Sequence, residues 1–171
     1  TLRFPSILPW DAHWLAVVHD EAWATRMTGL LRDPRTEVVR VAPDHEPWSD
    51  PHGDGTREDL ASYVGFPRSR GPFDFVLVDG RARKDCLIEA RSIVDDRGVV
   101  VLHDANRLIY HEPFSLYPNH ELFWTRLIPH RRSAGGVWVG SPARPIAEVL
   151  DVSRHRKIWK ACRMIGRAIP C

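Results

Sequence analysis

The segment from Phe73 to Tyr110 limits the possible folds more than any other part of the chain. It contains two apolar runs of strand length, Phe75–Val78 and Val99–Leu102. Between them, residues 83–94 place apolar side chains on one face of a helix and charged side chains on the other. Two runs without polar alternation, separated by one helix, predict buried parallel strands that are joined by a right-handed crossover.

Polar residues follow both of these apolar runs directly. Asp79 and Gly80 come after the first run, and His103, Asp104 and Asn106 come after or near the end of the second. In open α/β sheets the ligand binds in the crevice beyond the carboxyl ends of the strands. The segment therefore predicts a site at this edge of the sheet as well as a fold.

The N-terminal part of the chain repeats the alternation of strand and helix. Strands are predicted at Trp14–Val18 and at residues 36–42, and a helix is predicted over residues 21–31 between them. Asp20 precedes that helix and is of the residue type that caps a helix N-terminus. These segments add a second strand–helix–strand unit to the prediction.

The C-terminal part predicts an antiparallel end to the sheet. A helix is expected over residues 119–127, and residues 128–132 and 136–140 are expected to form a closing hairpin. Another helix is expected over residues 142–152. The whole order predicts a doubly wound, mostly parallel α/β sheet with a C-terminal antiparallel hairpin, formed by residues 1–152.

Composition limits the class of protein. The chain has 171 residues, 43% of them hydrophobic and 27% charged, which suits one folded domain. Its formal net charge of +2 is too small to indicate nucleic-acid binding, so nucleic acid is not an expected partner of the domain. Three widely spaced cysteines, Cys86, Cys162 and Cys171, favour reduced thiols and a cytoplasmic location.

Residues 153–171 form a basic amphipathic tail. Between Arg154 and Arg167 the tail carries only basic charges, and its apolar residues recur at helical spacing. Such a segment is able to contact a membrane surface, an acidic partner or nucleic acid. It is also typical of a solvated helix that packs its apolar side on the domain.

Several chemistries are open to the polar residues at the sheet edge. Asp79, Asp104 and Asn106 offer an all-oxygen ligand set that suits a divalent cation such as magnesium. Three other interpretations are open for each carboxylate: a general base, a group that binds the hydroxyl groups of a ligand, or a helix cap. His103 is either a base that works near neutral pH or a residue hydrogen-bonded in the core.

Three arginines, Arg81, Arg83 and Arg107, flank the same edge. Guanidinium groups suit carboxylate or phosphate groups, so they indicate an acidic substrate. Surface ion pairs with nearby aspartates explain them equally well. Cys86 falls on the apolar face of the predicted helix and is expected to be a buried structural thiol.

These residues resemble class I S-adenosylmethionine-dependent methyltransferases. Val78–Arg83 and His103–Arg107, with Tyr110, resemble the fourth and fifth strands of a branch of small bacterial proteins with VDGxxR and HDxxR segments. Gly135–Gly140 resembles the GGxWxG segment near the end of that family, and Val17–Trp23 resembles its second strand and the following helix start. The similarity runs through residues 1–152.

The resemblance implies a Rossmann-like domain that transfers a methyl group to oxygen or nitrogen of a small or glycan-type acceptor. S-adenosylmethionine is the implied cofactor, and a divalent cation such as magnesium is an optional second one. The implied catalytic residues are Asp79, Arg83, His103 and Asp104, the implied metal ligands are Asp79, Asp104 and Asn106, and the implied cofactor-binding residues are His19, Asp20, Asp79 and Gly80.

The chain departs from the family in two places. The family has a first strand and a glycine-rich cofactor turn, whereas Thr1–Phe4 resembles the segment just after that turn, so both are expected to be missing and the domain truncated. The acidic residue that ends the family's second strand aligns with Val18, and Asp20 is its possible substitute. In the family the first strand lies between the strands that correspond to Trp14–Val18 and Phe75–Val78. Those two strands are therefore expected either to pair directly or to leave unpaired edges.

We accordingly expect weak or absent cofactor binding by these residues and impaired methyl transfer. The alternative is a catalytically inactive Rossmann-like module that binds a partner or an anionic surface through its basic tail. A nucleotide-sugar or dinucleotide enzyme on the same fold is less favoured, because the chain contains no GxGxxG segment.

Overall fold

A computed structural model describes residues 9–48, 52–124 and 135–164, with side chains described as far as residue 161. The chain divides into two compact units, residues 1–69 and residues 70–171. Each unit has its own sheet. No helix among the described residues is both long enough and apolar enough to cross a membrane.

The first unit contains a parallel pair of strands, β1 (Trp14–Val18) and β2 (Thr36–Arg40), joined by α2 (Glu21–Leu30). Asp20 caps α2 as predicted, because its carboxylate accepts the Trp23 backbone N–H at 2.6 Å. The short helix α3 (Ala61–Gly65) follows the loop after β2. The strand–helix–strand prediction for this part of the chain is confirmed.

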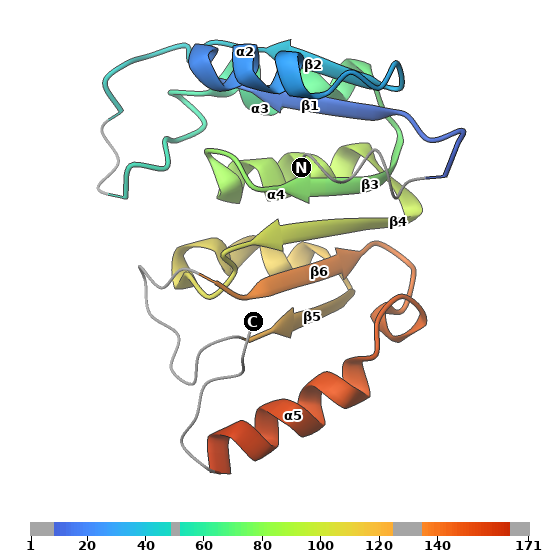
Figure 1. The fold of residues 1–171 in the computed structure, drawn as a ribbon. Coiled ribbons are helices and arrows are strands. Elements are labelled where there is room, and N and C mark those ends of the chain that lie inside the picture. The colour runs from blue at the N-terminus through green and yellow to red at the C-terminus, as the bar shows by residue number, and fades with distance from the viewer. Residues whose placement is uncertain (1–8, 49–51, 125–134, 165–171) are drawn as a thin grey trace. The chain divides into compact units, whose positions relative to one another are not determined.

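The second unit contains a four-stranded mixed sheet in the order β3-β4-β6-β5 (Figure 1). β3 and β4 are parallel and α4 connects them, whereas β6 is antiparallel to both β4 and β5. The bounds of these elements are Phe73–Val78 for β3, Arg83–Ile93 for α4, Val94–His103 for β4, Asn119–Phe123 for β5 and Val137–Ser141 for β6. The predicted parallel pair and the antiparallel end are thus present, and the fold is of the mixed α/β class.

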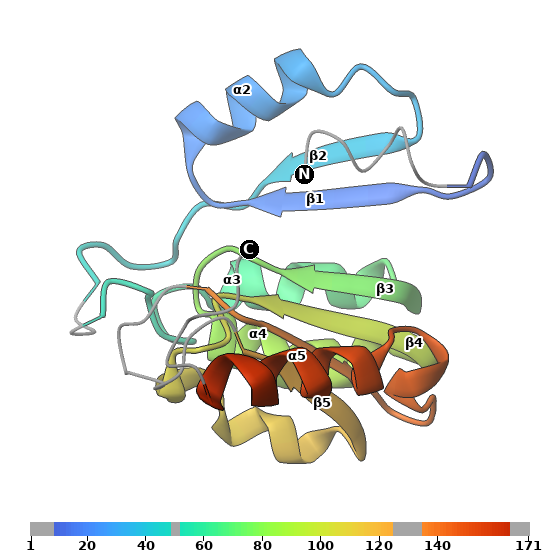
Figure 2. The same ribbon diagram turned by 60° about the horizontal axis from the view of Figure 1, so that its bottom comes forward.

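Side chains of a strand alternate between the two faces of a sheet. In this sheet both faces carry buried side chains that pack under other elements. Val100, Leu102 and Trp138 point to the face covered by α4 and by two short 3₁₀ helices, η2 (Leu108–Tyr110) and η3 (Glu112–Leu116). Val99 and Val139 point to the other face, where they pack with a third 3₁₀ helix, η4 (Ile146–Glu148), and with the start of α5 (Val152–Met164). Figure 2 shows α4 and α5 on opposite sides of the sheet.

Trp138 is the largest fully buried side chain of the described residues. Its ring stacks on Phe114 with centroids 4.7 Å apart and meets Tyr117 edge-on at 4.9 Å. The ring also lies over Gly140, where any side chain would collide with it. Residue 140 is therefore a glycine because a large indole occupies the space above its backbone.

Two predictions for the C-terminal part are wrong. Residues 119–123 form the strand β5 rather than the start of a helix, because their backbone pairs with β6 and Leu122 packs on the core. The helix expected over residues 142–152 is absent: residues 142–151 contain only the 3₁₀ turn η4, and the long helix α5 begins at Val152. Residues 128–132, expected as a hairpin strand, lie outside the described residues.

Strands β1 and β3 belong to different units and, in the described part of the chain, to separate sheets. β1 pairs only with β2, and β3 pairs only with β4. The two outcomes expected from the sequence, a direct pairing or unpaired edges, concern strands of different units and remain predictions. Within the second unit β3 is partly buried, and Phe75 on this strand is 40% exposed.

Candidate active site

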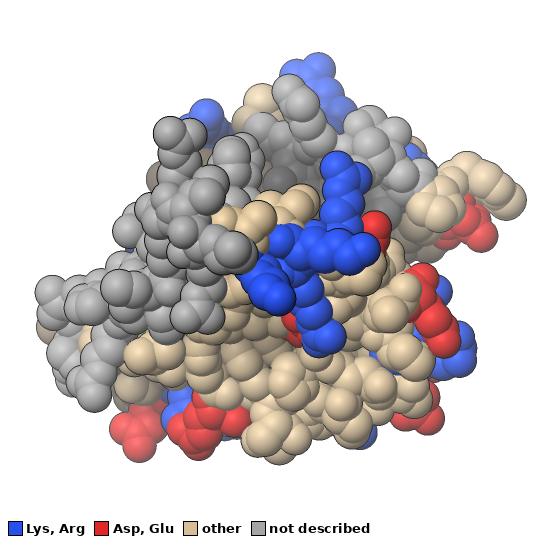
Figure 3. Space-filling view, turned by 90° about the horizontal axis from the view of Figure 1, so that it is seen from below, with Lys and Arg blue, Asp and Glu red and all other residues tan. Residues whose placement is uncertain are grey.

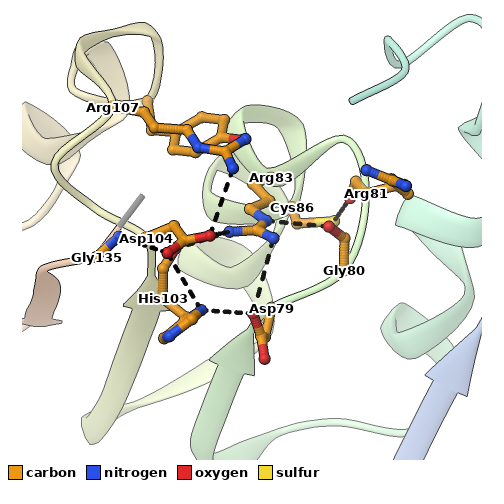
Figure 4. Close-up of polar contacts among 10 residues, drawn as sticks. Asp79, Gly80, Arg81, Arg83, Cys86, His103, Asp104, Arg107 and Gly135 are labelled. Atoms are coloured by element: carbon orange, nitrogen blue, oxygen red, sulfur yellow. Dashed lines mark hydrogen bonds and ion pairs between the residues drawn. The ribbon is translucent and has the colours of Figure 1, made fainter. Parts of the chain in front are cut away.

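The candidate active site lies where β3 and β4 end side by side. Val78 is in register with Leu102, so Asp79 and His103 are the next residues on neighbouring parallel strands. The loops after these strands carry Gly80 and Asp104. This is the edge at which the sequence predicted a site (Figure 4).

His103 and Asp79 form the solvent-facing part of the site. The His103 Nδ1 atom lies 2.9 Å from the Asp79 Oδ1 atom, and the two side chains are 51% and 45% exposed. Figure 4 shows the imidazole and the carboxylate facing each other across the strand ends. His103 therefore does not point into the core, which was one of the two interpretations of its position.

Arg83 lies on the buried side of this pair, and its side chain is only 10% exposed. Its Nε–H donates to the Gly80 carbonyl at 3.0 Å, and one terminal nitrogen donates to the His103 carbonyl at 3.0 Å and to the Asp104 carboxylate at 3.3 Å. The other terminal nitrogen is 3.7 Å from the Asp79 carboxylate. One buried cation therefore ties the ends of both strands together and contacts both carboxylates.

Asp104 is the buried carboxylate of the site, with a side chain 14% exposed. Its Oδ1 atom accepts the Gly135 backbone N–H at 2.6 Å, and its Oδ2 atom is 3.5 Å from Arg107. Burial alone would raise the pKa of Asp104, but the Gly135 N–H and the neighbouring positive charges together lower it below its ordinary value. Asp104 is held as an anion between these donors.

Tyr110 completes the support of the two arginines. Its hydroxyl accepts a hydrogen bond from Arg107 at 3.3 Å. The guanidinium carbons of Arg83 and Arg107 lie 5.8 Å and 5.9 Å from the centre of its ring. The ring, 1% exposed, thus helps to fix both cations.

The backbone at this edge is strained. Ala82 and Asp104, at φ 47° and 58°, are the two non-glycine residues with positive φ in the part of the chain that the structure describes. Each such residue costs about 1–2 kcal/mol. They follow β3 and β4, so the strain is concentrated at the candidate site, as is common at functional sites.

The predicted metal ligands are brought to the same edge but do not form an open metal site. Arg83 contacts both carboxylates, and Arg107 and Gly135 take up further acceptor positions on Asp104. Asn106 is fully buried, and its side chain lies against Gly136. No group of three or more His, Cys, Asp and Glu residues is placed to hold a metal ion within the described ranges. The geometry favours an ion-pair network over a cation site.

The predicted cofactor residues are divided between the two units. His19 and Asp20 belong to the first unit, where His19 packs against the rings of Trp48 and Tyr63 and Asp20 caps α2. Asp79 and Gly80 belong to the second unit. One carboxylate oxygen of Asp20 already accepts the Trp23 backbone N–H, and the Gly80 carbonyl accepts a hydrogen bond from Arg83.

Other residues singled out in the sequence also have defined contacts in this region. Arg83 and Arg107 pair with the site carboxylates, whereas Arg81 turns away from them in Figure 4. Cys86 was expected to be buried but is only partly buried, and its thiol donates to the Arg81 carbonyl at 3.3 Å. The bond from Gly135 to Asp104 was not predicted, although the paired glycines ahead of β6 were a signal of an unusual backbone there.

Comparison with known proteins finds a solved structure that is similar to this chain. A methyltransferase-like protein from Silicibacter pomeroyi, known from a crystal structure, is 21% identical to it with a TM-score of 0.48. The match covers 84% of this chain and 75% of that protein. No protein-family model matches the chain, and no curated protein matches it.

Proposed function

We propose that this chain provides the acceptor site of a methyltransferase, which transfers a methyl group from S-adenosylmethionine to oxygen or nitrogen of a small or glycan-type acceptor. Three features support the proposal: the VDGxxR and HDxxR segments, their position on adjacent parallel strands, and the polar network between them. The observation that carries it is the contact between His103 and Asp79 at the exposed edge.

His103 acts in this proposal as a general base. Asp79 accepts a hydrogen bond from Nδ1, which fixes the imidazole tautomer and leaves Nε2 as the acceptor atom. Nε2 would take the proton from the hydroxyl or amine of the methyl acceptor as that oxygen or nitrogen bonds to the methyl carbon and the carbon–sulfur bond of the methyl donor breaks. A positioned base of this kind contributes about 10²–10⁴-fold to the rate.

Arg83 and Asp104 are positioning residues in this account. Arg83 binds the backbone carbonyls of Gly80 and His103, so it fixes the turn after β3 and the end of β4. Asp104 holds Arg83 in place and is itself held by Gly135. The catalytic pair is thus carried on two strand ends that cannot move independently.

S-adenosylmethionine supplies the methyl group when it is bound. The 171 residues contain no GxGxxG segment, and the described turns after β1 and β3 carry His19-Asp20 and Gly80-Arg81-Ala82 instead of a glycine-rich loop. These residues do not form the backbone cradle that the cofactor requires. Isothermal titration is expected to show weak binding to residues 1–171, and micromolar affinity would contradict that expectation.

The experiment that tests the function is the transfer of a labelled methyl group to a panel of hydroxyl- and amine-bearing acceptors, at a high concentration of S-adenosylmethionine because weak binding is expected. His103→Gln should lower the rate by at least about 10²-fold, because the base is lost. His45→Gln, an exposed histidine of the first unit, is the matched control and should leave the rate unchanged. Equal rates for both variants would refute the role of His103.

A further inference from the structure

The outward side of α5 carries exposed charges of one sign. Arg154, Lys157 and Lys160 are exposed and, at 3.6 residues per turn, share a face with Ile158 at its margin. We call these four residues the basic face of α5. The sequence of α5 contains no Asp or Glu. Figure 3 shows the lysine and arginine side chains gathered on this side of the molecule.

The opposite side of α5 is attached to the second unit. Val152, 9% exposed, belongs to the hydrophobic cluster on this side of the sheet. His155 packs edge-on against Phe123 at 4.7 Å, and Trp159 stacks on Trp124 at 6.2 Å. The helix is therefore fixed with its apolar side inward and its basic face outward.

The charges of the basic face have no ion-pair partner among the described residues. Arg156, at the margin toward β5, pairs with Glu121 at 2.5 Å, but Arg154, Lys157 and Lys160 form no such contact within the part described. Asp151 at the helix start interacts electrostatically with Arg154 and Lys157, and its carboxylate accepts the Arg154 backbone N–H at 2.9 Å. Elsewhere in the second unit, Lys84, Arg97 and Arg144 are each paired with a glutamate.

Apolar side chains are exposed beside these charges. Ile158 is 40% exposed on the basic face, and Val149 and Leu150 just before α5 are 37% and 40% exposed. Basic and apolar side chains on one helix surface fit the headgroup region of a membrane, where phosphates meet acyl chains. Nucleic acid fits less well, because Trp159, the one aromatic residue of α5, stacks inward and is not available to bases.

We propose that the basic face of α5 binds the anionic phospholipid headgroups of a membrane, with α5 lying along the membrane surface. Arg154, Lys157 and Lys160 contact the phosphates, and Ile158 enters the headgroup layer. Each basic residue near such a surface strengthens binding by about fivefold. The surface is separate from the candidate active site, so this proposal stands or falls independently of methyl transfer.

The test is cosedimentation of the 171-residue chain with phosphatidylcholine vesicles, with and without phosphatidylglycerol. The variant R154Q/K157Q/K160Q should bind the anionic vesicles about 100-fold more weakly, because three charges are removed. R26Q/K84Q/R97Q changes the net charge equally and should bind like the parent chain. Ile158→Ser should weaken the binding that remains at high salt, where the apolar contact matters most. Circular dichroism checks that each variant is folded.

Four outcomes would overturn the proposal. The first is equal binding to neutral and anionic vesicles, and the second is no binding to either. The third is an equal loss in the control variant, which would indicate a net-charge effect. The fourth is binding to mixed-sequence DNA or RNA oligonucleotides without binding to vesicles, which would identify the basic face of α5 as a nucleic-acid surface.

Discussion

At the scale of the residue, two carboxylates at one sheet edge have different surroundings. Asp79 is 45% exposed and faces His103, whereas Asp104 is 14% exposed and is surrounded by Arg83, Arg107 and the Gly135 N–H. A half-exposed carboxylate beside an imidazole is suited to orient a base. A buried carboxylate with its acceptor positions filled is suited to hold a backbone turn and a buried cation.

Asp104→Asn is therefore expected to destabilise the second unit. Loss of the charge leaves Arg83 without its buried counter-charge, at a cost of about 1–3 kcal/mol. The pKa of Asp104 is lowered in the folded state, so its stabilisation is complete above the unfolded value of about 3.9 and is lost as pH falls through the folded value. Urea unfolding should show a large difference between variant and parent near neutral pH and a small one in acid.

Asp74→Asn is the control for this prediction, because Asp74 is an exposed residue of β3. It should change the free energy of unfolding by no more than about 0.5 kcal/mol. A difference between Asp104→Asn and the parent that stays constant across the acid range would show that the charge of Asp104 is not the source of its contribution.

Gly136→Ala should also destabilise the second unit. Gly136 has a φ of +75°, and an added Cβ would meet the side chain of Asn106 and, at 3.1 Å, its backbone nitrogen. The positive φ and the collision together should cost about 2 kcal/mol. Gly29→Ala in α2 adds a methyl group in open space and should be neutral or stabilising by about 0.5–1 kcal/mol. Thermal unfolding compares the two variants, and similar melting temperatures would contradict the account of Gly136.

The sequence predicted where the site residues lie, but it did not predict which carboxylate is buried and which is exposed. Asp79, His103 and Asp104 were expected at one sheet edge because they follow buried parallel strands, and they lie there. Which carboxylate is buried depends on the loop before β6, since Gly135 reaches Asp104 from 31 positions away. Periodicity within a strand or a helix carries no information about such a contact.

At the scale of the element, α4 is fastened to the chain that leads into β5. The hydroxyl of Tyr117, fully buried, donates to the Leu87 carbonyl at 2.7 Å. Burial raises the pKa of Tyr117, so the phenol stays protonated and remains a donor across the physiological range. This bond joins the helix that follows the candidate site to the antiparallel end of the sheet.

Tyr117→Phe should lower the free energy of unfolding of the second unit by about 1–2 kcal/mol, because the buried Leu87 carbonyl loses its donor. The change removes one oxygen and leaves the ring, so the contact with Trp138 is retained. Chemical denaturation followed by tryptophan fluorescence measures the effect. A variant as stable as the parent would show that water or another donor replaces the hydroxyl.

The wrong helix prediction for residues 119–123 also belongs to this scale. Asn119 to Phe123 contain no β-branched residue, so local preference does not favour a strand. Pairing with β6 and the packing of Leu122 against the core outweigh that preference. The neighbouring strand β6 explains why residues 119–123 form a strand instead of a helix. The sequence of these residues alone does not identify that neighbour.

At the scale of the whole molecule, the second unit has a complete core of its own. Both hydrophobic clusters on its sheet consist of residues from within 70–171. Residues 70–171 expressed alone should therefore unfold cooperatively in urea, and their amide NMR spectrum should be well dispersed. A fragment without a cooperative transition would show that the first unit is needed to stabilise the sheet.

The role of His103 and Asp79, at the ends of neighbouring strands, can be tested most directly by chemical rescue of His103→Ala. The methyl-transfer assay should show a loss of at least about 10²-fold in this variant, since the general base is missing. Added imidazole should restore part of the rate, because the side chain of His103 is 51% exposed and leaves a cavity open to solvent beside Asp79. Full activity in His103→Ala, or a loss that imidazole does not relieve, would contradict the role of His103 and Asp79 as the catalytic pair.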